Sequence, residues 1–228
     1  GSLCALLGPN AAGKTTLLKG ICGLTPHRGK CFVEGAPLTD MNEREMAHYI
    51  SYIPQRCTLQ VPISVMDVVL MGYTAKLSFF GSPSNQVRVR GLEALSQVGM
   101  AEQSERSYLE LSEGQRQLVI LARALVQDTP LMIFDEPDSA LDFTNKHKVL
   151  SMIQSTIVGA KKGGLICIHD PNFALRYCNS ALLLYEGRLI EHIEFANATT
   201  EELREALSRL YGGVDILTHN GHYIMTKS

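Results

Sequence analysis

The residues near the start of the chain have the types and the spacing needed to bind phosphate. Gly8 and Gly13 frame a turn that leads directly into Lys14 and Thr15, in the pattern G-x-x-x-x-G-K-T. An apolar run, residues 3–7, precedes the turn and a helical pattern follows it, which is the strand–turn–helix context that this motif requires. Glycines let backbone N–H groups approach an anion, and the helix start points its positive end at it. The pattern therefore predicts a site for nucleotide phosphates.

Two side chains of this loop have predicted roles of their own. Lys14 supplies positive charge for the β- and γ-phosphates, and the hydroxyl of Thr15 is the expected ligand of Mg²⁺. The other residues of the loop contribute backbone donors and shape. The complete set expected to contact the nucleotide here is Gly8, Pro9, Asn10, Ala11, Ala12, Gly13, Lys14, Thr15 and Thr16.

Two acids and a histidine come directly after later apolar runs. Asp135 and Glu136 follow one run, and His169 follows another. Such runs predict buried parallel strands, and ligands bind at the carboxyl ends of these strands. We expect Asp135 to hold Mg²⁺, directly or through water, and Glu136 to polarise an attacking water. The alternative is a strand followed by a simple helix cap. His169 is a candidate partner of the γ-phosphate, although a histidine at a strand end is usually structural.

Gln55 and Ser112 are further candidates. Gln55 follows a strand that ends at a proline, and its neutral amide can reach Mg²⁺ or the attacking water. Ser112 is a good N-cap, and with Gly114 and Gln115 it opens a helix that offers a second anion site. A single nucleotide site has no use for a second such helix. The arrangement makes sense if this helix caps a nucleotide held by another copy of the chain.

These residues need a scaffold that brings strand ends together. Strands alternate with helices along the chain, which predicts an α/β fold with a mostly parallel, doubly wound sheet. The stretch from Gln55 to about Leu125 reads instead as a helical insertion. Thr200 is expected to cap the last long helix, and Asn220-Gly221 predicts a terminal hairpin. The main expected strands are 49–53, 131–136, 165–168 and 181–185, and the main expected helices are 14–22, 86–98, 112–127 and 145–158.

Composition excludes several classes of protein. The chain has 228 residues, 45% of them hydrophobic, which suits one domain with a full core. A net charge of -2 gives no general attraction to nucleic acid. The six cysteines form no C-x-x-C pair, so we expect buried thiols in a reducing compartment. No apolar stretch is as long as a membrane span, and no signal peptide is visible, so membrane association is expected to be peripheral and through a partner.

The stretch Leu111-Ser112-Glu113-Gly114-Gln115 is the motif that points to one particular protein family. The whole chain resembles the nucleotide-binding subunit of an ATP-binding cassette (ABC) transporter. Its motifs occur in the family's order. They match Walker A at residues 8–15, the Q-loop glutamine at Gln55, the signature at residues 112–115, Walker B at residues 131–135, the catalytic glutamate at Glu136, the D-loop at residues 139–142 and the switch histidine at His169.

The resemblance implies a P-loop NTPase core, residues 1–55 and 126–228, with an inserted helical subdomain, residues 56–125, in a single ABC ATPase domain. It implies a head-to-tail homodimer that sandwiches two ATP molecules with Mg²⁺ between the P-loop of one subunit and the signature helix of the other. Partners would be integral-membrane permease subunits and, indirectly, a substrate-binding protein, with no nucleic acid. The subunit would lie on the cytoplasmic face of the inner membrane.

A finer resemblance concerns the transported cargo. Residues 65–72, 142–145 and 211–213, together with the segment that contains Phe79 and Phe80, are similar to importer ATPases for iron–siderophore, haem or cobalamin.

A soluble ABC protein of DNA repair or the ribosome is an alternative, but such proteins usually carry two cassettes or a long coiled coil. An exporter subunit is another, but those are commonly fused to membrane spans. The insertion also has apolar residues that we expect to form a surface for a permease helix, although we expect about half of them to lie in the core of the subdomain instead. These residues are Val61, Val65, Leu70, Tyr73 and Phe79.

The sequence departs from the family pattern at a few positions. Ala11 and Glu113 stand where glycine is usual, and Asp138 stands where threonine is common. Ala11 is expected to tighten the loop, and Glu113 to repel phosphate unless its carboxylate points away. The family's adenine-stacking aromatic lies upstream of the P-loop, outside the given sequence. We therefore expect weak ATP binding and an incomplete N-terminal antiparallel subdomain.

Overall fold

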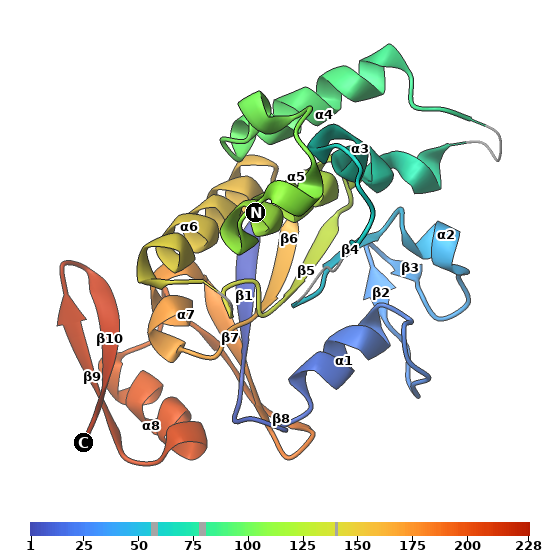
Figure 1. The fold of residues 1–228 in the computed structure, drawn as a ribbon. Coiled ribbons are helices and arrows are strands. Elements are labelled where there is room, and N and C mark those ends of the chain that lie inside the picture. Colours follow the sequence, from blue (N-terminus) through green and yellow to red (C-terminus); the bar gives the residue numbers. More distant parts are fainter. Residues whose placement is uncertain (56–58, 78–80, 140) are drawn as a thin grey trace.

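A six-stranded sheet forms the centre of the fold (Figure 1). The computed structural model describes residues 1–55, 59–77, 81–139 and 141–228. Five neighbouring strands run parallel, and the last is antiparallel to its neighbour, so the predicted mostly parallel α/β sheet is confirmed. In spatial order the strands are β4 (Ile50–Ile53), β5 (Leu131–Asp135), β6 (Gly163–Cys167), β1 (Ser2–Leu7), β7 (Ser180–Tyr185) and β8 (Arg188–Glu194).

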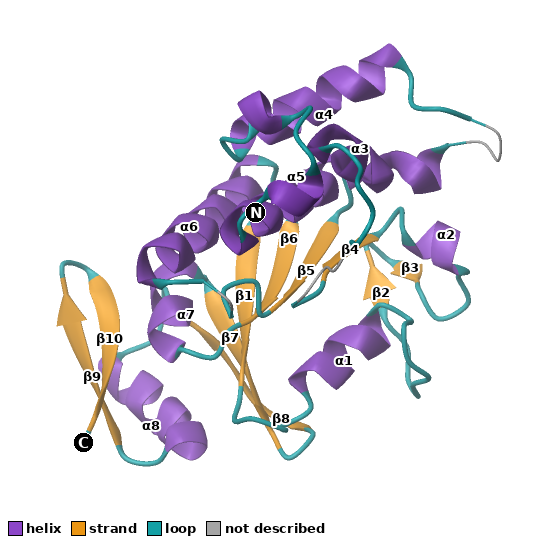
Figure 2. Ribbon diagram, in the orientation of Figure 1, coloured by secondary structure: helices purple, strands orange, loops and turns teal. Residues whose placement is uncertain are grey.

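Helices cover both faces of this sheet (Figure 2). The helix α1 (Lys14–Ile21) packs on one face, where its Leu18 meets Leu6 and Ile133 of the strands. The other face, which carries Leu3 and Phe134, packs against α5 (Glu113–Gln127), α6 (Phe143–Gly159) and α7 (Pro171–Tyr177). Each strand alternates its side chains between these two cores. The strand ends that carry the acids are thereby held rigidly beside the start of α1.

The insertion between β4 and β5 is helical, as predicted. It contains α3 (Val65–Leu70), α4 (Asn85–Gln97) and three short 3₁₀ turns before α5: η1 (Met71–Lys76), η2 (Ala101–Gln103) and η3 (Tyr108–Glu110). It forms the upper layer in Figure 1. Gly72 lies so close to α5 that a Cβ there would be 2.1 Å from the carbonyl oxygen of Arg123. The insertion and α5 therefore pack backbone against backbone.

Only part of the apolar surface expected on this insertion is exposed. Val65 and Leu70 are buried in the core, whereas Val61 is 55% exposed. Tyr73 is half-buried, with the ammonium of Lys76 over its ring. Phe79 and Phe80 lie outside the described residues.

The remaining elements extend this core at its two ends. The last helix, α8 (Thr200–Tyr211), is capped by Thr199, which corrects the expected cap at Thr200, because the Thr199 hydroxyl accepts from the N–H of Glu202. The terminal hairpin consists of β9 (Val214–His219) and β10 (His222–Lys227), joined at Asn220-Gly221 as predicted. A small antiparallel pair, β2 (Phe32–Val33) and β3 (Ala36–Pro37), precedes the short helix α2 (Glu43–Met46).

The cysteines are mostly buried thiols. Cys22, Cys167 and Cys178 are buried and Cys4 and Cys31 are half-buried, and all five are free, while Cys57 lies outside the described residues. Among the helices that the structure describes, none is both long and apolar enough to cross a bilayer.

Candidate active site

The loop between β1 and α1 wraps tightly at the end of β1. Gly13 has a φ of 98°, a left-handed conformation that favours glycine. A Cβ on Gly8 would lie 2.3 Å from the carbonyl oxygen of Leu184, so this loop must approach β7 without a side chain. Ala11 adopts a φ of 63°, where a Cβ is strained. This backbone conformation explains why the family that the chain resembles usually has glycine at this position.

The loop encloses a cavity of about 210 Å³. The buried ammonium of Lys14 donates to the carbonyl oxygens of Gly8 and Pro9, at 2.9 and 3.0 Å, which holds it over the loop. The cavity brings the predicted phosphate-binding residues together with Glu136 and His169. Its lining consists of Asn10, Ala11, Ala12, Gly13, Lys14, Thr15, Thr16, Glu136 and His169.

Asp135 does not line the cavity but is buried beside Thr15, which does, and is 3% exposed. Its Oδ1 accepts a hydrogen bond from the Thr15 hydroxyl at 3.0 Å, so these two expected metal-binding residues do meet. Asp135, Glu136 and Cys167 each place one possible ligand atom within 4.8 Å of the others. Burial raises the pKa of Cys167 to about 12, so its thiol stays protonated near neutral pH. The available donors are therefore hydroxyl and carboxylate oxygens, a set that suits Mg²⁺.

Glu136 is held from both sides by polar side chains. Its Oε1 lies 2.7 Å from His169 Nε2, and its Oε2 accepts from Gln55 Nε2 at 2.6 Å. The backbone of Glu136 has a φ of 52°, which turns the chain sharply at the end of β5. Gln55 thus contacts Glu136, the residue expected to polarise the attacking water, and its contact with Mg²⁺ stays a prediction. In this arrangement Glu136 is an oriented carboxylate beside the phosphate-binding loop, as a general base requires.

The signature residues lie away from this cavity. Ser112 caps α5: its hydroxyl accepts from the N–H of Gln115, whose side chain in turn accepts from the N–H of Ser112. Gly114 faces the start of α6, since a Cβ there would lie 3.5 Å from Leu141 Cδ2, just before α6, and 3.9 Å from Asn145 Cγ in its first turn. None of these residues lines the phosphate cavity of the same chain, and the carboxylate of Glu113 is on an exposed first turn. The D-loop residue Ala140 lies outside the described residues.

Two residues of the site were not predicted from the sequence. The Tyr52 hydroxyl donates to Asp135 Oδ2 at 2.9 Å. Asp138 is 3% exposed, and its Oδ2 lies 3.7 Å from Lys146 Nζ. Burial raises the pKa of Asp138, although Lys146 acts in the opposite direction. An aromatic residue near the end of a strand was the available signal for Tyr52, and the unusual acid after Pro137 was the signal for Asp138.

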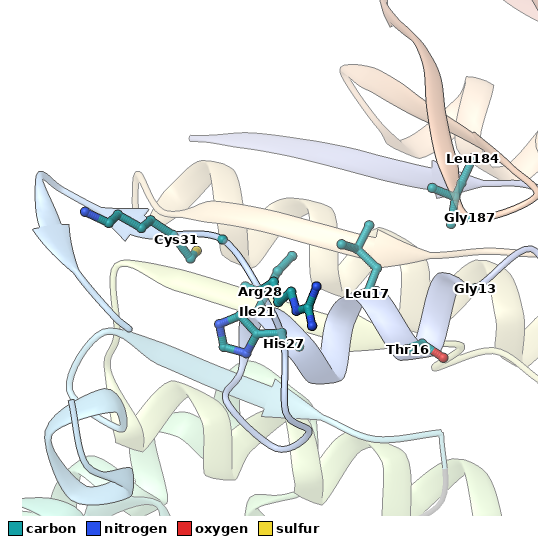
Figure 3. A pocket seen from close by; sticks show the side chains of 12 residues that line it. Gly13, Thr16, Leu17, Ile21, His27, Arg28, Cys31, Leu184 and Gly187 are labelled. Carbon is teal, nitrogen blue, oxygen red and sulfur yellow. The ribbon is translucent and has the colours of Figure 1, made fainter. Parts of the chain in front are cut away.

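A second hollow adjoins the phosphate cavity (Figure 3). It has a volume of about 430 Å³ and shares Gly13 and Thr16 with that cavity. Leu17 and Ile21 of α1 form one wall, and His27 and Arg28 border it from the segment that follows. His27 supplies the only aromatic ring among its described lining residues.

The comparison with known families fits this geometry. A family model described as ABC transporter matches residues 1–139, which include the P-loop, the signature and both acids. The chain belongs to the ABC transporter family. Members of this ABC family bind nucleotide and hydrolyse ATP, so the chain is an ABC ATPase.

Several ABC proteins of named function are similar over most of this chain. The zinc transport system ATP-binding protein TroB of Treponema pallidum is 38% identical over 216 residues, 93% of this chain and 77% of the relative. The hemin import ATP-binding protein HmuV of Bordetella bronchiseptica is 34% identical over 96% of this chain and 85% of its own length. The cobalamin import ATP-binding protein BtuD of Halobacterium salinarum is 32% identical, with 83% and 47% covered.

A solved structure supports the fold assignment. A chain from a structure described as a metal-chelate type ABC transporter in an inward-facing conformation superposes with a TM-score of 0.79 at 27% identity. The match covers 98% of this chain and 84% of that one. The ABC ATPase fold, with its parallel sheet and flanking helices, is therefore shared along nearly the whole chain.

Proposed function

We propose that this chain is the ATP-hydrolysing subunit of an ABC importer. The observation that carries the proposal is the pairing of Glu136 with Gln55 and His169 beside the phosphate-binding loop. Relatives are named for zinc transport, iron chelatin transport, hemin import and cobalamin import, and a structural neighbour is of the metal-chelate type. We assign this chain to uptake of a metal ion or a metal-containing compound such as an iron chelate, haem or cobalamin.

Each residue of the site has a proposed role. Lys14 and the N–H groups of residues 8–16 bind the β- and γ-phosphates. Mg²⁺ would be held by Thr15 and Asp135, and when bound it neutralises charge that develops on the phosphates. Glu136 removes the proton of the attacking water. His169 and Gln55 orient the Glu136 carboxylate, and His169 also lies on the cavity that would hold the γ-phosphate.

The position of the signature favours a dimer. At the start of α5, Ser112 is exposed and Gly114 and Gln115 are half-buried, and none of the three lines the cavity of its own chain. A helix start of this kind stabilises an anion. We propose that it completes the nucleotide site of a second copy, so that two ATP molecules are bound between two chains.

The helical insertion is the proposed link to the membrane. We assign residues 1–55 and 126–228 to the catalytic core and residues 56–125 to a subdomain that relays closure of the dimer. Exposed Val61 and half-buried Tyr73 are candidates for contact with an integral-membrane permease subunit. The protein would then be peripheral, on the cytoplasmic face of the inner membrane, and a substrate-binding protein would join the complex only through the permease.

Purification from detergent-solubilised membranes tests this proposal. The chain should copurify in stoichiometric amount with a polytopic membrane protein, and the complex should hydrolyse ATP. The Lys14→Ala variant should copurify equally but bind no ATP. Copurification with ribosomes or DNA would favour the alternative of a non-transport ABC ATPase, and a partner that moves its substrate outwards would favour an exporter.

A further inference from the structure

The hydroxyl of Tyr52 completes the hydrogen bonding of Asp135. Thr15, on α1, donates to Oδ1 at 3.0 Å, and Tyr52, on β4, donates to Oδ2 at 2.9 Å. Two elements thus hold the two oxygens of one carboxylate. We propose that Tyr52 is a positioning residue that fixes the orientation of Asp135 for binding Mg²⁺. This inference rests on the proposed ATPase site and adds a residue to it.

The register of the sheet explains how Tyr52 reaches this position. Tyr52 lies beside Ile133 in the parallel pair β4 and β5, and Asp135 comes two residues after Ile133. Because side chains alternate along a strand, Tyr52, Ile133 and Asp135 share one face, the face covered by α1. The ring of Tyr52 packs against the apolar cluster that includes Leu18 and Ile133. Packing therefore fixes the ring, and the ring carries its hydroxyl to the end of the neighbouring strand.

The phenol is chemically suited to hold a carboxylate. A phenol hydroxyl has one O–H donor, and here it points to a carboxylate oxygen 2.9 Å away. The carboxylate rotates about a broad torsion, so an outside donor is needed to select one orientation. Thr15 is itself an expected metal ligand, and its bond to Asp135 competes with that task. Tyr52 is free of this conflict, because it is not among the expected ligands.

The same end of β4 also holds the second acid. Tyr52 bonds Asp135, and Gln55, three residues later, bonds Glu136. Ile53, between them, pairs with Phe134 in the sheet. The two acids at the end of β5 are therefore both oriented from β4 and the residues that follow it. Partners of this kind behind metal ligands contribute about 10–100-fold to metal affinity.

The Tyr52→Phe variant tests the inference by removing one oxygen atom. The affinity for Mn²⁺ is measured by electron paramagnetic resonance with a non-hydrolysable ATP analogue, and the affinity for the analogue alone is measured in EDTA. We expect Mn²⁺ to bind about tenfold more weakly to the variant. Binding of the analogue in EDTA should stay the same, because Tyr52 does not line the phosphate cavity. Tyr49→Phe is the matched control, since Tyr49 packs against the same cluster, and it should change neither affinity.

Three outcomes would overturn the inference. Unchanged Mn²⁺ affinity in Tyr52→Phe would show that the hydroxyl does not position the acid. If Tyr52→Phe lost Mn²⁺ binding and metal-free analogue binding equally, or if a lower thermal midpoint of the variant explained both losses, Tyr52 would be a structural residue only. If the unaltered protein bound neither Mn²⁺ nor the ATP analogue, the proposed ATPase site would be overturned as well. If the unaltered protein bound both, the proposed function would stand whatever the result for Tyr52→Phe.

Discussion

At the scale of single residues, the orientation of Glu136 leads to a direct prediction. Glu136→Gln keeps the shape of the side chain but removes the basic oxygen pair that Gln55 and His169 hold. ATP binding should persist, while turnover should fall by about 10²–10⁴-fold, the range for losing a general base. Equilibrium ATP binding and phosphate release under single-turnover conditions measure the two effects. A near-normal rate would transfer the role of base to another group, with His169 the first candidate.

Asp138 carries a prediction about pH and stability. Its raised pKa means that the folded protein binds the proton more tightly than the unfolded chain does. The stability contributed by this group is complete below the ordinary aspartate pKa and is lost as pH rises through the raised value. Asp138→Asn removes the cost of ionising this buried group, so it should increase the free energy of unfolding at pH 7. The gain should vanish near pH 4, as followed by urea unfolding.

The partner of Asp138 provides the control for this prediction. Lys146→Gln leaves the buried carboxylate without its cation, so it should destabilise the protein at pH 7 and much less at low pH. If Asp138→Asn lowered the free energy of unfolding instead, the ion pair between Asp138 and Lys146 would stabilise the folded protein, and the prediction would be wrong.

At the scale of elements, the contact between η1 and α5 leaves no room for a side chain at Gly72. A Cβ at Gly72 would come within 2.1 Å of the Arg123 carbonyl oxygen and 3.2 Å of the Gln127 nitrogen. Gly72→Ala should therefore separate these helices and lower the free energy of unfolding by about 1–3 kcal/mol, the usual cost of overpacking. Gly159→Ala is the control, because nothing lies within 4 Å of a Cβ there, and it should be neutral or slightly stabilising. Urea midpoints of both variants decide the comparison.

The elements also show what sequence alone could predict. Gly8–Thr16, Asp135–Glu136 and His169 each come at the end of an apolar run, so their place at one sheet edge followed from the parallel topology. Tyr52 was missed because its bond to Asp135 depends on β4 lying beside β5, a pairing between residues about eighty apart. Gln55 was predicted at the site, beside Mg²⁺ or the attacking water, but its bond to Glu136 was not, because the rotation of an amide is not encoded by local pattern. The cap of α8 differed by one residue because two adjacent threonines can both serve.

At the scale of the whole molecule, the exposed start of α5 predicts ATP-dependent pairing of two chains. With ATP, Glu136→Gln should approach twice the chain mass of 25.1 kDa in light scattering. Adding Ser112→Asp should abolish this, because aspartate keeps the helix cap but repels the phosphates of the partner's nucleotide. Ser112→Asn keeps the cap without charge and should retain much of the pairing. Equal dimerisation of the two double variants would place the interface elsewhere.

The position of β1 has a consequence for how the protein is made. This strand precedes every other described strand in sequence but lies between β6 and β7 in the sheet, where Leu3 pairs with Gly164 and Leu7 with Leu183. At ribosomal speeds, on the order of ten to thirty seconds separate the synthesis of Ser2 from that of Gly163. During that time the apolar β1 segment has neither of its neighbours. β1 therefore cannot complete its pairing, and Gly8 cannot reach its close approach to Leu184, until residues 163–185 have been translated.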